Sequence, residues 1–302
     1  MNLSDIFHHH SFFALWRPDF FLIVVVLGTI YALVTGPYRT KLKVETEPVS
    51  KWKRISFYTG LFIFYLTHGT PLHVIGFYYL FSAHMLQMAT TYMVVVPLLI
   101  LGIPEWGFEA LLGQGRRRRI FAILTHPLVA VLSFNLMLGL YHVPAIFDFV
   151  MSIHALHLTY HYFLTFASIL LWWPIISPLK GEHQMVFLKK FAYILAGSVL
   201  ITPVCALVIF AQDVIYTTFV DAPRLFETLT VHYDQQLGGI IMKLLQELAF
   251  ATALMILIYL WLQKDNPGKK IDPIDERYLS SISGEEKVSL NTGKPSTEQG
   301  GT

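Results

Sequence analysis

Three histidines in the stretch HALHLTYH, namely His154, His157 and His161, have types and spacing that suit ligand binding. Their spacing of i, i+3 and i+7 puts the three imidazoles on one face of a helix. Inside a membrane protein, such a polar face needs a partner. Imidazoles that project from one helix toward another can bind a transition metal or a haem, or hydrogen-bond one another in a packed interior.

A second pair of potential ligands, His84 and Met88, lies at i, i+4 in an earlier apolar stretch, and His157 and His161 share that spacing. Imidazole with thioether suits copper, Cu(I) in particular, because a soft thioether is a poor ligand for harder metal ions. We therefore predict a copper site for one or two ions, formed by His84, Met88, His154, His157 and His161. The alternative is that the histidines bond to loop carbonyls and that Met88 is ordinary packing.

The elements that must hold these residues are expected to be membrane-spanning helices. The chain has 302 residues, of which 54% are hydrophobic and 14% are charged. This composition is too apolar for a soluble domain of this length. Charge-free apolar runs of about 20 residues are long enough to cross a hydrocarbon core of about 30 Å as helix. We therefore expect an all-α integral membrane protein, in contact with the lipid bilayer and with no nucleic-acid partner.

The apolar runs predict a bundle of seven transmembrane helices. They cover about residues 20–35, 55–66, 74–101, 120–141, 154–176, 191–211 and 237–262. The connections after the odd-numbered runs are rich in Lys and Arg, whereas the connections after the even-numbered runs contain only Arg224. The positive-inside rule then puts the N-terminus outside and the C-terminus in the cytoplasm.

This pattern divides the chain into three regions. Residues 1–18 carry histidines and aromatic side chains, which predict an extracytoplasmic segment at the membrane interface. Residues 19–262 form the seven-helix transmembrane domain. Residues 263–302 are rich in Lys, Glu, Ser, Thr and Gly and predict a disordered cytoplasmic tail.

Depth along the helices brings the candidate ligands together. Counting about 20 residues outward from the inner end of each span puts His84 level with His157, and Met88 level with His161. Both levels lie in the outer third of the membrane. The sequence therefore predicts a metal site that faces the outside.

Two further residues in the last apolar run, Lys243 and Glu247, are charged and lie at i, i+4. Glu247 is the deeper of the two and must face protein, water or a partner charge. A structural ion pair, a proton path and a carboxylate beside the metal are the open interpretations. Asp234, in the segment DQQLGG, is expected either to cap the last helix or to approach the histidines.

Five short segments together resemble a known family. They are FSAHMLQM at 81–88, VVVPLLILGIP at 94–104, THP at 125–127, HLTYHYFL at 157–164 followed by WWP, and DQQLGG at 234–239. The set resembles the polytopic CtaG family of cytochrome c oxidase assembly factors, which is associated with caa-type oxidases of Gram-positive bacteria. The resemblance implies a multi-pass protein of the bacterial plasma membrane that helps mature the oxidase by handling its copper. It also implies that His84, His157 and His161 match family histidines, whereas Met88 replaces a second histidine found in many relatives.

The function expected from the residues and the resemblance together is that of a non-enzymatic copper metallochaperone for oxidase assembly. It would receive copper outside, for instance from an extracytoplasmic copper chaperone, and pass it to an oxidase subunit. A copper transporter and a haem-binding electron carrier are the alternatives. The chain lacks HExxH, GxSxG and Walker motifs, so we expect no enzyme. Whether the protein forms a homo-oligomer is left open.

Overall fold

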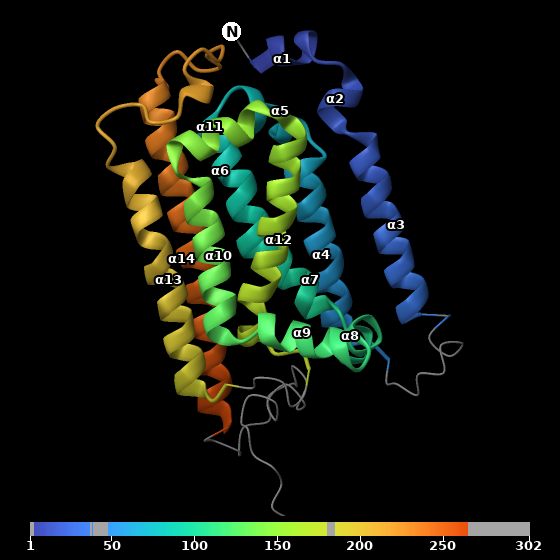
Figure 1. Ribbon diagram of the computed structural model, residues 1–302. Helices are drawn as coiled ribbons and strands as arrows, with labels where there is room; N and C mark the ends of the chain where they lie inside the picture. Colours follow the sequence, from blue (N-terminus) through green and yellow to red (C-terminus); the bar gives the residue numbers. More distant parts are fainter. Residues whose placement is uncertain (1–2, 37, 39–47, 180–184, 265–302) are drawn as a thin grey trace, which may run out of the picture.

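A computed structural model of the protein describes residues 3–36, 38, 48–179 and 185–264, and every regular element in these residues is a helix. The prediction of an all-α fold is thereby confirmed. The helices, labelled in Figure 1, are α1 (Leu3–His9), α2 (Phe12–Trp16), α3 (Pro18–Thr35), α4 (Lys51–His68), α5 (Pro71–Tyr78), α6 (Phe81–Thr90), the π-helical turn η1 (Thr91–Val95), α7 (Val96–Gly102), α8 (Glu105–Leu112), α9 (Arg116–Leu124), α10 (Pro127–Tyr141), α11 (Pro144–Ser152), α12 (His154–Ile176), α13 (Phe187–Ile209), the 3-10 turn η2 (Thr217–Phe219) and α14 (Val231–Lys264).

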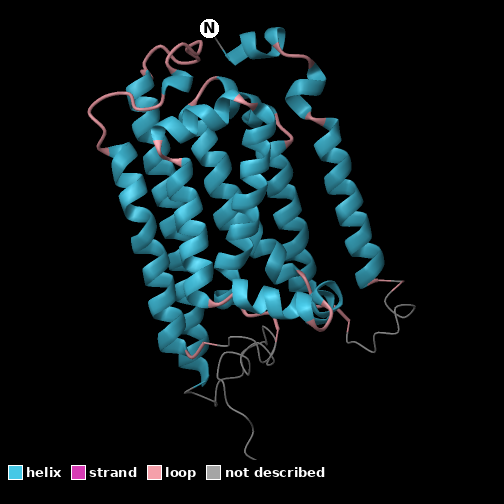
Figure 2. Cartoon of the chain, in the orientation of Figure 1, coloured by secondary structure: helices cyan, strands magenta, loops and turns pink. Residues whose placement is uncertain are grey.

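The long helices stand side by side, and short helices close both ends of the bundle (Figures 1 and 2). α1, α5 and α11 lie at the end that carries the N-terminus, whereas α8 and α9 lie across the opposite end. In the bundle, α6 packs against α14, α12 packs between α7 and α10, and α13 packs against α10 and α14. α3 packs on the outer side of α4 (Figure 1), and its Tyr31 hydroxyl donates to the Gly102 carbonyl of α7 at 2.8 Å.

Several helices are long and apolar enough to cross a membrane. They are Phe12–Thr35, Phe81–Gly102, Phe187–Ile209 and Val231–Gln263, with a fifth if the bent pair α9–α10 counts as one span. α4 begins with three cations and α12 carries three imidazoles, which make both helices less apolar than the others. The structure therefore shows a multi-pass helical membrane protein with four or five candidate spans.

The apolar run 74–101 is two helices and not one, because α5 ends at Tyr78 and α6 begins at Phe81. Asp234 of α14 holds the start of α6. Its carboxylate accepts hydrogen bonds from the backbone N–H of Phe81 at 2.7 Å, from the N–H of Ser82 at 3.1 Å and from the Ser82 hydroxyl. An aspartate at a helix start satisfies N–H groups that the helix leaves open. Asp234 thus caps α6. The two predicted roles are different: a cap of the last helix, or an approach to the histidines.

The run 120–141 is also broken, between α9 and α10, where the two helices meet at 67°. Pro127 is the first residue of α10, and a residue before proline disfavours helical geometry, which ends α9 at Leu124. α9 therefore lies across the end of the bundle, with its four arginines, and α10 is the upright part of the predicted span (Figure 1).

The π-helical turn η1 interrupts the middle of the α6–α7 helix and ties it to α12. The carbonyl oxygen of Tyr92 accepts a hydrogen bond from the Ser168 hydroxyl at 2.7 Å and one from the Trp172 indole N–H at 2.9 Å. A π turn disturbs the regular ladder of helical hydrogen bonds, so this carbonyl is open to partners outside its own helix. These bonds fix the depth of α6 relative to α12.

The predicted regions at the two ends of the chain fall partly outside the described residues. Ile6 of α1 and Leu15 of α2 are buried beside Val74 and Leu80, so the N-terminal segment packs on the end of the bundle. Its placement at the membrane interface stays a prediction. α3 begins at Pro18 and α14 ends at Lys264, close to the predicted boundaries. Residues 265–302, most of the predicted tail, lie outside the described residues.

Candidate metal centre

Three histidines from two helices meet in the upper part of the bundle. His84 of α6 and His157 and His161 of α12 can each offer one ring nitrogen, and these nitrogens lie within 4.8 Å of one another. The ring centroid of His84 is 5.4 Å from the centroid of His157 and 5.4 Å from that of His161. The centroids of His157 and His161 are 4.3 Å apart. The set is called the His triad below. Nitrogens this close could hold a metal ion, and at about 2.1 Å from one ion they would draw slightly nearer to one another.

Two tyrosine hydroxyls orient the His triad. The Tyr141 hydroxyl lies 2.8 Å from His84 Nε2, and the Tyr92 hydroxyl lies 2.8 Å from His161 Nδ1. His161 Nε2 has only a long contact of 3.4 Å with Tyr141. A metal-binding histidine usually hydrogen-bonds through its other ring nitrogen, which fixes the ring and the tautomer.

Two nitrogens of the triad, His84 Nδ1 and His157 Nε2, are buried and have no hydrogen-bond partner among the described residues. The side chains of His84 and His157 are 1% and 6% exposed. A buried polar atom without a partner is costly, so each such atom calls for an explanation. A shared metal ion would supply the missing partner for both nitrogens.

The walls of the His triad are aromatic. Phe147 of α11 contacts the His84 ring edge-on at 5.8 Å, and Phe77 of α5 contacts the His157 ring at 5.0 Å. These rings bury His84 and His157, whereas His161 is partly exposed. The short helices α5 and α11 cover the site at the N-terminal end of the bundle.

The other two predicted ligands lie elsewhere. His154 is exposed at the start of α12, where its ring contacts Phe77 at 5.4 Å. Met88 is 1% exposed and lines a small cavity with Met242 and Ile201, between α6, α10, α13 and α14. The structure thus brings together three of the five predicted residues. Roles for His154 and Met88 as copper ligands stay predictions.

The sequence interpretation missed Tyr92, Tyr141 and Met151. Tyr92 follows His84 by two helical turns, so its position on the same side of the helix was a usable signal. The roles of Tyr141 at the end of α10 and Met151 in α11 depend on tertiary packing. The Tyr141 hydroxyl lies 3.7 Å from Met151 Sδ, which places a thioether just behind the triad.

A second polar network lies beside the triad, where α4, α5 and α6 meet. The amide Nε2 of Gln87 lies 2.9 Å from His68 Nδ1 and 3.2 Å from His73 Nδ1. His68 Nε2 lies 2.8 Å from the Thr91 hydroxyl. In α5, outside the spans, burial and the nearby Arg17 charge lower the pKa of His73 to about 4. Gln87, Thr91 and Arg17 satisfy the ring nitrogens of these histidines, and the contacts hold three helices together.

The chain matches one known protein family. The family model described as cytochrome c oxidase caa3 assembly factor (Caa3_CtaG) matches residues 29–264. This range contains the whole His triad and both tyrosines that orient it. No curated protein and no solved structure gives a significant match to the chain.

Proposed function

The chain belongs to the caa3 cytochrome c oxidase assembly-factor family, and we propose that it binds copper at the His triad and delivers it to an oxidase subunit within the membrane. The proposed role is non-catalytic: the protein holds a metal ion and hands it on. Copper is the cargo, and Cu(I) is the form that suits buried imidazoles with a thioether nearby.

The observation that carries this proposal is the pair of unpartnered nitrogens. His84 Nδ1 and His157 Nε2 are buried without a hydrogen bond in the described part of the chain, while the tyrosines hold the opposite nitrogens of His84 and His161. Mutual hydrogen bonding of histidines, the simplest structural explanation, would have used these two atoms. A metal site explains why they are left open.

We also propose seven spans, with the N-terminus outside and the C-terminus in the cytoplasm of a bacterial plasma membrane. α4 and α12 would add two spans to the candidates. At 1.5 Å per residue their 18 and 23 residues measure about 27 and 34 Å, close to the hydrocarbon thickness. The cations of α4 and α9 lie at the end opposite the N-terminus in Figure 1, where the positive-inside rule puts the cytoplasm. The His triad would then receive copper from the outside.

Haem binding is disfavoured by the packing of the triad. Two imidazoles that ligate one haem stand on opposite faces of a macrocycle, whereas the centroids of His157 and His161 are 4.3 Å apart on the same helix. Phe77 and Phe147 occupy the space beside the rings. We therefore expect the absorption spectrum of the purified protein to show no Soret band.

A copper transporter remains the second candidate because thioethers continue inward. Met88, Met93 and Met242 line the small cavity below the triad. Farther along α12, however, Trp172 and Trp173 are buried in an apolar core. Delivery from the outer site therefore fits the structure better than passage through it.

The proposal is tested by measuring Cu(I) binding to the purified full-length protein, in competition with a chromophoric chelator. We expect the His84→Ala, His157→Ala double variant to lose the tightly bound ion. His142→Asn is the matched control, because His142 is buried nearby, bonded to the Leu138 carbonyl and Met85, and outside the triad. His154→Ala and Met88→Leu test the two remaining predicted ligands separately.

If the double variant bound as much Cu(I) as the wild type, the copper site would be abandoned. If the control lost copper equally, the effect would be a folding defect. The X-ray absorption spectrum of bound Cu(I) would then be compared between the wild type and the double variant, to show whether imidazole ligands are lost. Oxidase activity in cells carrying each variant then tests whether copper binding and oxidase maturation change together.

A further inference from the structure

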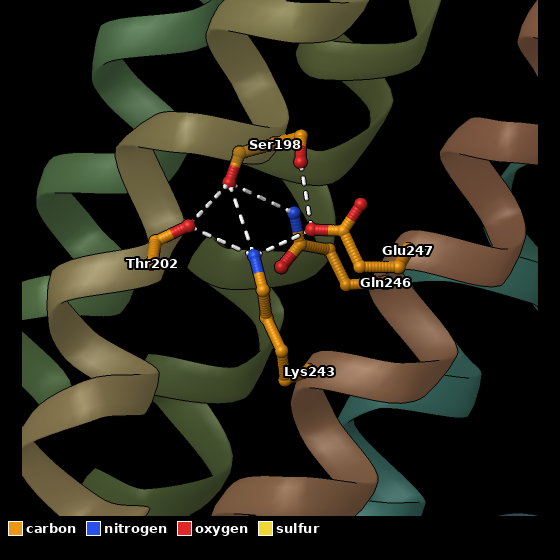
Figure 3. Close-up of polar contacts among 5 residues, drawn as sticks. All are labelled: Ser198, Thr202, Lys243, Gln246 and Glu247. Carbon is orange, nitrogen blue, oxygen red and sulfur yellow. Dashed lines mark hydrogen bonds and ion pairs between the residues drawn. The ribbon is translucent and has the colours of Figure 1, made fainter.

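A polar cluster unrelated to the His triad lies between α13 and α14 (Figure 3). Lys243 Nζ lies 2.5 Å from Glu247 Oε1, and it donates hydrogen bonds to the Thr202 hydroxyl at 2.8 Å and the Ser198 carbonyl at 3.4 Å. The Ser198 hydroxyl donates to the same oxygen of Glu247 at 2.7 Å. Gln246 donates to the Ser198 carbonyl at 3.3 Å. These contacts join the two helices.

With α13 and α14 as membrane spans, the cluster lies in the hydrocarbon region and near the centre of both helices. Glu247 is the seventeenth of the 34 residues of α14, about 25 Å from either end at 1.5 Å per residue. A hydrocarbon slab about 30 Å thick, placed anywhere along this helix, therefore includes Glu247. Ser198 is the twelfth of the 23 residues of α13, which is the centre of that helix too. Both helices thus put their polar groups at the same central depth.

The ion pair faces outward and not into the bundle. The side chains of Lys243 and Glu247 are 23% and 43% exposed. Their neighbours on the same surface, Leu244 and Leu248 of α14 and Val199 of α13, are exposed apolar residues that face lipid. In the isolated protein, part of an ionised carboxylate therefore lies against hydrocarbon, which is unfavourable.

The two charged groups differ in whether all of their hydrogen-bonding atoms have partners. Lys243 already has three acceptors. Glu247 receives both of its contacts on Oε1, and its Oε2 has no partner among the described residues. A structural ion pair explains the inner contacts of this cluster. It does not explain an open carboxylate oxygen on the lipid-facing side at the centre of the membrane.

We propose that the surface of α13 and α14 centred on Glu247 docks a transmembrane helix of an oxidase subunit, which presents a hydrogen-bond donor to Glu247 at mid-membrane depth. This rests on the proposed role in oxidase assembly. A helix is the element that satisfies its own backbone in hydrocarbon. Because Lys243 and Glu247 together are neutral, a neutral donor such as Ser, Thr, Asn or Tyr is complementary.

A small side chain beside Glu247 allows a helix to approach closely. Ala251 of α14 is one turn from Glu247 and is exposed. Close backbone approach over small residues, with interhelical hydrogen bonds, drives helix association in membranes, where no hydrophobic effect acts. The surface thus offers both contributions to one partner helix.

The test is photo-crosslinking of the full-length protein in membranes of cells that make the oxidase. A photoreactive amino acid replaces Leu248, which is 63% exposed beside Glu247, and crosslinked products are identified by mass spectrometry. Leu22 of α3 is the control position, because it is 62% exposed but lies on the other side of the bundle. We expect an oxidase subunit at Leu248 and none at Leu22.

A charge swap separates docking from a structural role. The double variant Lys243→Glu, Glu247→Lys keeps an ion pair on α14. At position 247, however, an ammonium donor then faces the partner helix in place of a carboxylate acceptor. We expect the crosslink to the oxidase subunit to fall about fivefold to tenfold, as the loss of one such bond implies. The swap removes the Lys243 bond to the Ser198 carbonyl, which Gln246 still contacts, so the thermal stability should fall only slightly.

Three outcomes would overturn the proposal: a crosslink at Leu248 only to a second copy of this chain, a crosslink only to lipid, or an unchanged crosslink in the swapped variant. The His84→Ala, His157→Ala protein distinguishes this proposal from the copper proposal. Its crosslink at Leu248 should persist if docking does not need copper. Conversely, the swapped variant should still bind Cu(I).

Discussion

At the scale of single residues, two tyrosine hydroxyls each hold one nitrogen of a triad imidazole. The Tyr141 hydroxyl contacts His84 Nε2, and the Tyr92 hydroxyl contacts His161 Nδ1. Because a tyrosine hydroxyl can donate or accept, these contacts fix the ring orientations. In the tautomers in which the imidazoles donate to the tyrosines, His84 Nδ1 and His161 Nε2 carry the lone pairs that the proposed metal ion would use.

Removing the Tyr92 hydroxyl should weaken Cu(I) binding without removing a ligand. In Tyr92→Phe, His161 loses the bond that fixes its ring, and loss of such a partner costs about 10- to 100-fold in metal affinity. Tyr160→Phe is the control, because the Tyr160 hydroxyl donates to the Met137 carbonyl and, among the described residues, makes no hydrogen bond to the triad. Chelator competition on both proteins measures the difference. Equal affinities would mean that Tyr92 does not orient His161.

At the scale of elements, short polar contacts fix how the helices meet at the end of the bundle that carries the N-terminus. Asp148 of α11 accepts hydrogen bonds from the N–H and the hydroxyl of both Thr217 and Thr218, between 2.6 and 3.0 Å. Burial alone would raise the pKa of Asp148, but these four bonds outweigh it and hold the pKa below its usual range. The carboxylate thus joins the cover of the triad to the loop before α14.

The four hydrogen bonds to Asp148 make part of the free energy of unfolding depend on pH. Because the folded pKa of Asp148 is lowered, its contribution is complete above the unfolded pKa of about 3.9 and is lost as pH falls through the folded value. Asp148→Asn should cost about 1 kcal/mol at neutral pH, since several bonds are weakened. The gap in Tm between wild type and variant should be constant above about pH 5 and shrink below about pH 4. A gap that widened in acid would contradict this account.

Close approach of helices at the end opposite the N-terminus depends on one glycine. A Cβ added at Gly102 of α7 would lie 2.5 Å from the Cβ of Phe57 and 2.8 Å from its Cα, so α4 would have to move. We expect Gly102→Ala to destabilise the protein by about 1–3 kcal/mol. Gly139→Ala is the control, since its nearest contact is Val204 Cγ2 at 3.6 Å, and it should gain about 0.5–1 kcal/mol. Thermal unfolding in detergent measures both, and similar shifts in the same direction would refute the argument.

At the scale of the whole molecule, one end of the bundle carries the triad, its aromatic cover and the N-terminus, and the other carries α8 and α9 (Figure 1). A single cysteine in a Cys205→Ser background reports which end faces outward. Thr228→Cys, in the loop before α14, should react with a membrane-impermeant maleimide in intact cells. Gln114→Cys, between α8 and α9, should react only after permeabilisation. The reverse pattern would put the His triad on the cytoplasmic side.

The sequence by itself determined the all-α membrane class, the family and the three histidines that meet. Apolar runs of bilayer length require helices because lipid offers no partner for backbone N–H and C=O groups. Helical spacing then put His157 and His161 on one face, and equal distance from the inner ends of the spans put His84 near them.

Only the tertiary structure decided what surrounds those histidines. The break at Tyr79–Leu80 depends on Asp234, which is 153 residues away from Phe81 in the chain and is brought to it by the packing of α14 on α6. The placing of Met88 in a separate cavity, and of Tyr92 and Tyr141 against the imidazoles, follows from helix rotation. Rotation about the helix axis is set by side chains on neighbouring helices, whereas the pattern within one helix fixes only which residues share a face.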